Sequence, residues 1–124
     1  MLAKIRGKVI RGRGVGKKLG FPTANIFFEE IFFKKNWGVY ASIVTLRDFR
    51  MPAVTHIGPA KTFNETTPRI EAHILDLDED IYGETIEIEF LKKLRNTKKF
   101  GTIEKLSEHI ARDIRQTREY FKRM

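Results

Sequence analysis

Hydrophobic and polar residues alternate along several short stretches of the chain, which is the pattern of β-strands with one buried face. In residues 3–10, Ala3, Ile5 and Val9 share one face, and three basic residues share the other. Residues 37–46 are rich in β-branched and aromatic side chains, which favours a central strand. The first part of the chain therefore predicts at least two strands.

The next segments predict that the sheet is antiparallel. A polar hairpin turn is expected at residues 47–50, followed by a returning strand at residues 52–57. Residues 85–91 also alternate, and there Glu87 and Glu89 are expected on the ordinary solvated face of a half-buried strand.

The segments between these strands are less regular. Residues 60–68 are polar and rich in turn formers, so we expect a loop at the mouth of a ligand site. Residues 26–35 contain several aromatic residues at a spacing closer to helical than alternating. We expect one helical turn or a packed loop there, with the aromatic side chains in the core.

A helix is predicted at the C-terminal end of the chain. Thr102 is a suitable N-cap, and hydrophobic residues then recur at helical spacing, at Ile103, Leu106, Ile110, Ile114 and Phe121. This stripe is expected to pack on the sheet. The opposite face mixes basic residues with Glu104, Glu108, Asp113 and Glu119, which favours a solvated face over a nucleic-acid-binding one.

Five or six short strands and one terminal helix, with no strand–helix alternation, predict a mainly β fold. The expected architecture is an antiparallel barrel or sandwich with the C-terminal helix packed on it. The chain has 124 residues, the length of one domain. We expect the barrel over about residues 1–100 and the helix over about residues 102–122.

The composition limits the possible partners and chemistry. A formal net charge of +8 and a pI near 9.9 predict anionic partners, such as nucleic acid, a membrane surface or a phosphorylated small molecule. The chain has no cysteine, so a disulfide framework and thiolate chemistry are excluded. No apolar run is long enough for a membrane span, and we expect a cytoplasmic protein without a membrane partner.

A glycine-rich basic stretch at residues 12–25 is the strongest local signal. It holds four of the nine glycines, and glycine backbone can form an anion-binding nest beside basic side chains. The spacing excludes both the Walker A loop and the G-x-G-x-x-G pattern. A nucleotide polyphosphate site and a mobile basic loop or RNA-contacting hairpin tip remain as interpretations. The candidate nucleotide-binding residues in this stretch are Gly12, Gly14, Gly16, Lys17, Lys18, Gly20, Pro22, Thr23 and Asn25.

Two of these residues are also candidate metal ligands. Thr23 and Asn25 are two residues apart, so on a strand their side chains project from the same face. A hydroxyl and an amide oxygen are hard, neutral ligands, and they suit Mg²⁺ when phosphate oxygens and water complete the coordination.

A carboxylate and an imidazole lie side by side on another predicted strand, at residues 69–77. Glu71 and His73 share one face, opposite the hydrophobic residues. An ordinary solvated face is the alternative interpretation of this pair. His56 and His109 are expected to be structural, because no second metal-type ligand lies at a recognisable spacing from either.

Together these residues resemble the ATP-dependent riboflavin kinases, or flavokinases, over nearly the whole chain. The most specific shared motifs are Gly20-Phe21-Pro22-Thr23-Ala24-Asn25 and Glu71-Ala72-His73-Ile74-Leu75-Asp76. The other shared positions are Gly7, Val9, Gly12, Gly14, Gly16, Leu19, Gly38-Val39-Tyr40, Ile57-Gly58, Tyr82-Gly83, Leu94-Arg95 and Lys99-Phe100, with the spacing to Leu106 and Asp113.

The resemblance implies a six-stranded Greek-key barrel with a C-terminal helix. It also implies transfer of the γ-phosphoryl group of ATP to the 5′-hydroxyl of riboflavin, giving FMN and ADP, with Mg²⁺ as cofactor. By resemblance, Glu71 is the catalytic base, and Thr23 and Asn25 lie at the Mg²⁺–nucleotide site. Tyr82 closes over the nucleotide, and Arg95 and Phe100 flank the flavin.

The sequence departs from the family at several positions. His56 stands where many relatives have Asn or Ser, Lys61 where Pro is expected, and Asn96-Thr97 replaces Pro-Glu. These changes fall on the flavin side of the expected site. Bacterial members usually also carry an N-terminal adenylyltransferase domain that makes FAD. This sequence begins at the kinase part, so FAD synthesis is not expected.

Two other classes of function are compatible with the charge and the fold. One is a basic β-barrel that binds nucleic acid, although the interspersed acidic residues argue against it. The other is a non-catalytic flavin- or nucleotide-binding module. We expect a monomeric enzyme whose partners are riboflavin, FMN, ATP and ADP, and we do not expect nucleic acid as a partner.

Overall fold

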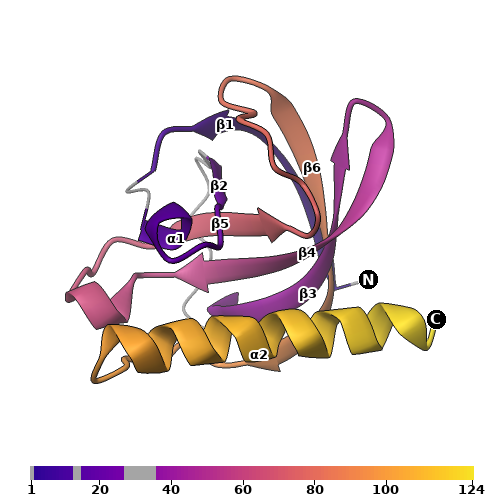
Figure 1. Cartoon of the computed structure of the whole chain (residues 1–124). Helices are drawn as coiled ribbons and strands as arrows, with labels where there is room; N and C mark the ends of the chain where they lie inside the picture. Colours follow the sequence, from indigo (N-terminus) through magenta and orange to yellow (C-terminus); the bar gives the residue numbers. More distant parts are fainter. Residues whose placement is uncertain (1, 13–14, 27–35) are drawn as a thin grey trace.

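Six antiparallel strands close into a barrel in the computed structural model, which describes residues 2–12, 15–26 and 36–124 (Figure 1). The order around the barrel is β1-β2-β5-β4-β3-β6, so the expected Greek-key barrel with a C-terminal helix is confirmed. Gly14 and residues 27–35, where we expected a helical turn or packed loop, lie outside the described residues. The elements in chain order are β1 (Ala3–Ile10), α1 (Val15–Lys18), β2 (Ala24–Ile26), β3 (Gly38–Leu46), β4 (Phe49–Gly58), the 3₁₀ turn η2 (Lys61–Phe63), β5 (Arg69–Ile74), β6 (Thr85–Arg95) and α2 (Ile103–Lys122).

The hairpin between β3 and β4 is tighter than expected. Its two central residues, Arg47 and Asp48, have φ angles of 48° and 71°, and the pair Leu46–Phe49 closes the ladder around them. Positive φ at both central positions is the type I′ geometry whose twist matches the flanking strands. The returning strand therefore begins at Phe49 rather than at residue 52.

Alternate residues of the strands fill the barrel with apolar side chains. On β1, Ile5 and Val9 are buried, whereas Ala3 at the start of the strand is exposed. Ile86, Ile88 and Phe90 of β6 are almost completely buried in the same core. The barrel interior is thus a packed hydrophobic core.

Helix α2 covers part of the outer wall of the barrel, beside β3 and β4 (Figure 1). Its predicted N-cap is confirmed, because the Thr102 hydroxyl accepts a hydrogen bond of 3.1 Å from the backbone N–H of Lys105. Ile114 packs with Val39 and Val54 in a small second core between helix and sheet. Within the described part of the chain, no helix is long and apolar enough to cross a membrane.

Two acidic residues that we expected to be solvated are buried. Glu89 is 9% exposed, and its two carboxylate oxygens accept hydrogen bonds of 3.0 and 3.1 Å from the guanidinium of Arg50. Asp113 on α2 is 2% exposed and pairs with Arg95. Both predictions were wrong because each carboxylate has an arginine partner from a distant part of the chain.

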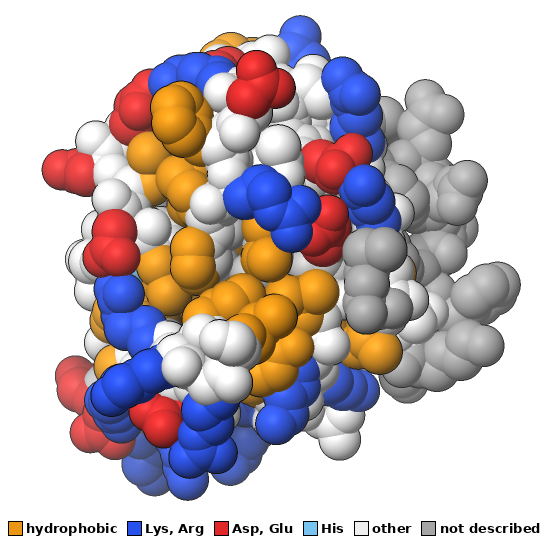
Figure 2. Space-filling view, turned by 90° about the vertical axis from the view of Figure 1, so that its right-hand side faces the viewer, with side chains coloured by type: hydrophobic (Ala, Val, Ile, Leu, Met, Phe, Trp, Pro, Cys, Tyr) orange, Lys and Arg blue, Asp and Glu red, His pale blue; other side chains and the backbone are white. Residues whose placement is uncertain are grey.

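Charges of both signs are mixed over the surface of the barrel and helix. Figure 2 shows Lys and Arg side chains gathered along the lower edge of one face, where α2 runs, with acidic side chains among them. Among the acidic groups, Asp76 pairs with Arg118 and Glu119 with Arg123. The prediction of a mixed helix face is confirmed for these residues.

Candidate active site

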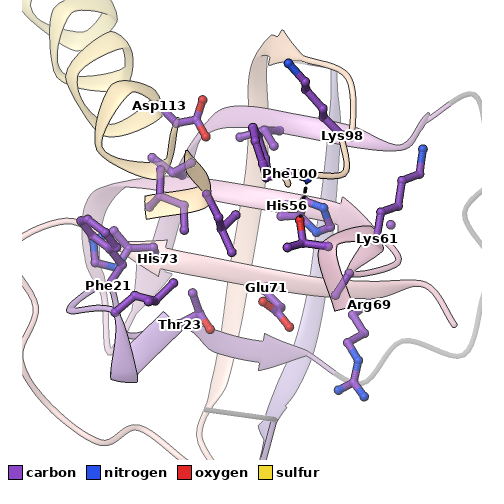
Figure 3. Close-up of a pocket in the computed structure, with 18 of the residues that line it drawn as sticks. Phe21, Thr23, His56, Lys61, Arg69, Glu71, His73, Lys98, Phe100 and Asp113 are labelled. Carbon is purple, nitrogen blue, oxygen red and sulfur yellow. Dashed lines mark hydrogen bonds between the residues drawn. The ribbon is translucent and has the colours of Figure 1, made fainter. Parts of the chain in front are cut away.

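Two of the three residues expected to do the chemistry lie on neighbouring strands, and Thr23 directly precedes the first of these strands, β2. Asn25 of β2 is the direct cross-strand partner of Glu71 of β5. Ala24 and Ala72, which alternate with them, point into the barrel core. Because side chains alternate across a strand, the side chains of Asn25 and Glu71 project from the outer wall. Figure 3 shows Thr23 close to Glu71, at the base of the same hollow.

An apolar hollow of about 150 Å³ lies between this wall, helix α2 and the segment that precedes the helix. Its hydrophobic lining includes Phe21, Phe63, Phe100 and, from the helix stripe, Leu106 and Ile110. These two helix residues were expected to pack directly on the sheet, but they face the hollow instead. The polar residues that line it are Thr23, Asn25, His56, Lys61, Thr62, Arg69, Glu71, His73, Arg95, Lys98 and Asp113. The expected loop at residues 60–68 contributes η2 to the mouth.

A second, charged hollow of about 300 Å³ lies on the other side of β2. Its charged lining residues are Arg11, Lys17, Asp78, Glu79 and Asp80, and Gly12, Pro22 and Ala24 also line it. Thr23 and Asn25 line both hollows. These two residues therefore form the boundary between an apolar site and a charged one.

The amide oxygen of Asn25 is the best candidate for a metal ligand. Asn25 is 7% exposed, and its Oδ1 is buried without a hydrogen-bond partner among the described residues. A buried polar atom of this kind normally has a partner. Gly12 lies so close that a Cβ at that position would overlap the side chain of Asn25. The site thus holds an unsatisfied hard oxygen in a fixed place, which fits Mg²⁺.

The described part of the chain offers no alternative metal site built from several ionisable side chains. In residues 2–12, 15–26 and 36–124, no group of three or more His, Asp or Glu side chains could hold a metal ion. A cation held by Thr23 and Asn25 would need its remaining ligands from phosphate and water, as the sequence predicted.

The glycine-rich segment forms part of the wall of the charged hollow. Lys17 lines this hollow, whereas the exposed Lys18 is not among its lining residues. Gly16 lies in the short helix α1, and Gly20 has a φ of 88°, which only glycine adopts without strain. Of the nucleotide-binding candidates within residues 12–25, the structure thus places Gly12, Lys17, Pro22, Thr23 and Asn25 at the hollow.

Tyr82, in the segment between β5 and β6, also lines the charged hollow. It is 53% exposed, and the guanidinium of Arg11 lies 4.1 Å from the centre of its ring. Arg11 also donates a hydrogen bond of 3.0 Å to Asp80. The backbone N–H of Tyr82 and then Arg11 hold the pKa of Asp80 below its usual value. Arg11 was not among our candidates, although it directly precedes Gly12.

Arg95 and Phe100 line the apolar hollow, as the flavin-side prediction requires. The guanidinium of Arg95 lies 5.4 Å from the centre of the Phe100 ring. The backbone N–H of Phe100 donates a hydrogen bond of 3.1 Å to the hydroxyl of Thr62, which is drawn as a dashed line in Figure 3. The ring is thereby fixed over the hollow.

His73 has a structural contact. Its Nδ1 lies 2.6 Å from the backbone carbonyl oxygen of Pro22, and a carbonyl can only accept, so Nδ1 donates. The edge of its ring also packs against Phe21. His73 therefore ties β5 to the segment that leads into Thr23, a contact that supports the structural role that we favoured for it.

His56 also lines the apolar hollow, opposite Glu71 on the neighbouring strand β4. Burial, together with the nearby cations Arg95 and Lys61, lowers the pKa of His56 to about 4. The sequence marked His56 as a departure from the family on the flavin side of the expected site, and the structure places it at the apolar hollow.

Comparison with known proteins identifies the family. The family model described as flavokinase, riboflavin kinase, matches residues 2–121. The bifunctional riboflavin kinase/FMN adenylyltransferase of Escherichia coli K12 is 36% identical over 118 residues, which is 94% of this chain and 37% of that protein. The chain thus spans less than two fifths of the length of this relative.

Solved structures are similar as well. A riboflavin kinase from Trypanosoma brucei superimposes with a TM-score of 0.68 and 27% identity, covering 96% of this chain and 79% of that one. A Streptococcus pneumoniae protein described as a macrolide-efflux protein gives a TM-score of 0.80 and 31% identity, over 93% of this chain and 38% of its own. From the match over residues 2–121 and the shared barrel, the chain belongs to the riboflavin kinase (flavokinase) family.

Proposed function

We propose that this chain transfers the γ-phosphoryl group of ATP to the 5′-hydroxyl of riboflavin, giving FMN and ADP. The observation that carries the proposal is the position of Thr23 and Asn25 between the apolar and charged hollows. An apolar hollow lined by aromatic side chains suits the isoalloxazine ring, and a charged hollow lined by Gly12, Arg11 and Lys17 offers groups that can bind a polyphosphate. The two substrates would then meet at Thr23, Asn25 and Glu71. Residues 1–124 would act as one riboflavin-kinase-like domain.

Glu71 is the base in this proposal. As the acceptor oxygen forms its bond to the γ-phosphorus, the bond from that phosphorus to the β,γ-bridging oxygen breaks, and the hydroxyl proton passes to the Glu71 carboxylate. Phosphoryl transfer has a loose transition state, so positioning and charge stabilisation supply most of the catalysis. Glu71 lies on a rigid barrel strand, cross-strand from Asn25, and can orient the hydroxyl accurately.

Thr23 and Asn25 would hold Mg²⁺ through their side-chain oxygens. When bound, the ion would neutralise charge on the phosphate oxygens. Lys17 and Arg11 face the same hollow and would attract the negatively charged nucleotide. Tyr82 would lie against the nucleotide at the edge of this hollow, and Arg95 and Phe100 would flank the flavin.

The test is the formation of FMN from riboflavin, ATP and Mg²⁺, measured by HPLC. Glu71→Gln is expected to reduce turnover by about 10²–10⁴-fold while riboflavin, followed by its fluorescence, still binds. Glu87→Gln is the matched control, because Glu87 pairs with Lys4 on the opposite side of the sheet from the barrel core and lines neither hollow. This variant should keep full activity.

Removal of divalent cations with EDTA should abolish turnover, and added Mg²⁺ should restore it. If the wild type makes no FMN with ATP, GTP or CTP, the proposal is wrong. The chain would then be a binding module, and riboflavin and RNA binding would be measured next.

A further inference from the structure

His56 is a polar side chain that faces the apolar hollow and has no hydrogen-bond partner within the part of the chain that the structure describes. Its side chain is half-buried on β4 and lines the hollow, as the ring of Phe100 does (Figure 3). Among the described residues, no hydrogen bond, ion pair or ring contact reaches its imidazole. Polar groups in such surroundings are normally hydrogen-bonded. The imidazole nitrogens of His56 are therefore available to a ligand in the hollow.

The position of His56 relative to Glu71 is fixed by the strand register. The two residues are direct cross-strand partners on β4 and β5. The Cβ atoms of such pairs lie about 4.5–5.5 Å apart. Figure 3 shows both side chains entering the same hollow. A hydroxyl that reaches the Glu71 carboxylate must therefore pass beside the imidazole.

The protonation state of His56 limits what it can bind. With a pKa lowered to about 4 by burial, Arg95 and Lys61, the imidazole is neutral at physiological pH. A neutral imidazole has one N–H donor and one nitrogen acceptor. Glu71 as a carboxylate only accepts, and the lysine and arginine side chains of the hollow only donate. Unlike Glu71 and these lysine and arginine side chains, His56 can both donate to and accept from a ligand, which matches an alcohol.

We infer that His56 is a specificity residue that binds the ribityl chain of the flavin, at a hydroxyl next to the one presented to Glu71. This inference rests on the proposed function. A polyol carries hydroxyls on adjacent carbons, and each hydroxyl can donate one hydrogen bond and accept up to two. His56 and Glu71 together then distinguish a flavin that carries this chain from the bare isoalloxazine ring.

The experiment compares the binding of riboflavin and lumiflavin, which has the same ring but no polyol, by titrating flavin fluorescence. In His56→Leu the affinity for riboflavin should fall about tenfold, as for the loss of a buried hydrogen bond, while the affinity for lumiflavin stays the same. His56→Asn keeps a donor and an acceptor and should recover most of the loss. Should His56→Leu not fold, His56→Ala is judged by the same criteria.

Val54→Ala is the matched control, since Val54 lies two residues away on the same face of β4 and lines the same hollow. This variant should lower the affinity for riboflavin and for lumiflavin by the same factor. An equal effect of His56→Leu on both flavins, or no effect on either, would overturn the inference while leaving the proposed function intact. A wild type that binds riboflavin no better than lumiflavin would also overturn it. A wild type that binds neither flavin would refute both the inference and the proposed function.

Discussion

The carboxylate of Asp113 holds the guanidinium of Arg95, with Nη2 2.9 Å from Oδ2 and Nε 3.0 Å from Oδ1. Asp113 comes from the middle of α2, and Arg95 is the last residue of β6. Both residues line the apolar hollow. The ion pair therefore joins the helix to the barrel at the wall of the proposed flavin site.

Asp113→Ala should destabilise the protein by about 3–5 kcal/mol, because the variant leaves a largely buried guanidinium without its partner. The free energy of unfolding in urea is the measurement. Arg118→Ala is the control, since it breaks the exposed pair with Asp76, whose pKa Arg118 lowers. Exposed pairs contribute little. If Asp113→Ala unfolds at the same urea concentration as the control, the pair does not fix the helix.

Gly12→Ala should impair catalysis more than folding. The new methyl group would overlap Asn25, so the amide must move away from the boundary between the two hollows. We expect the Mg²⁺ concentration for half-maximal activity to rise and kcat to fall, both measured by FMN formation. Gly101→Ala provides the comparison, because a Cβ there meets nothing within 4 Å. If kcat and the Mg²⁺ concentration for half-maximal activity are the same in both variants, the position of the Asn25 amide is not important for catalysis.

Arg47 at the β3–β4 turn supports the loop that borders the charged hollow. Its guanidinium pairs with Glu84 and lies 2.6 Å from Glu79, which lines the hollow. Arg47→Gln should raise the KM for ATP by about two- to fivefold, since exposed ion pairs are weak. The difference should shrink in 1 M salt. The KM is measured from the rate of FMN formation at varied ATP concentration and a fixed concentration of riboflavin.

Arg50→Gln is the control for Arg47, because Arg50 lies on the same hairpin but pairs with Glu89, away from both hollows. Its KM for ATP should equal that of the wild type. A KM for ATP that is unchanged in Arg47→Gln would remove the proposed link between hairpin and loop.

His56 should make stability depend on pH in a defined window. Its pKa is about 4 in the folded protein and near 6.5 when unperturbed, so the unfolded chain binds a proton first as the pH falls. Stability is then full above pH 6.5 and declines toward pH 4, by at most about 3 kcal/mol because water in the hollow screens the charge. Asp80 and Glu84 have lowered pKa values, so their contribution is lost at lower pH.

Urea unfolding at pH 7, 6, 5 and 4.5 separates these contributions. In His56→Asn the loss between pH 6.5 and 4.5 should largely disappear, while the steeper loss at lower pH should remain. A wild type and variant with parallel curves over this window would show that His56 is not desolvated in the folded protein.

Local patterns gave most of the elements correctly, because they reflect forces that act within a few residues. The alternation around Glu71 predicted both the strand β5 and the face on which Glu71 and His73 lie. The hydroxyl of Thr102 caps α2 as its type and position indicate. The hairpin turn after residue 46 was predicted, but its tight geometry at Arg47 and Asp48 was not, because neither residue favours positive φ as strongly as glycine does.

Features that depend on distant partners could not be predicted from local patterns. Asp113 lies among exposed charges in the sequence, and only the fold brings Arg95 to it. The closure of the barrel by β1 and β6 is likewise a pairing of strands about 80 residues apart. His56 was expected to be structural, and its position opposite Glu71 follows from the β4–β5 register rather than from its own neighbours.

The alternation of side chains along β2 and β5 makes the core and the proposed site depend on the same strand register. Alternate residues of each strand serve the barrel core and the proposed site, so one inserted or deleted residue in β5 would turn Glu71 inward and expose an alanine or isoleucine in its place. A single change in the length of β5 would therefore disrupt both the packing of the core and the geometry of the proposed site. Insertions and deletions should therefore be tolerated only in the connecting segments, such as the loop that carries η2, where a change in length can reshape the mouth of the apolar hollow without altering which residues of β2 and β5 face the core.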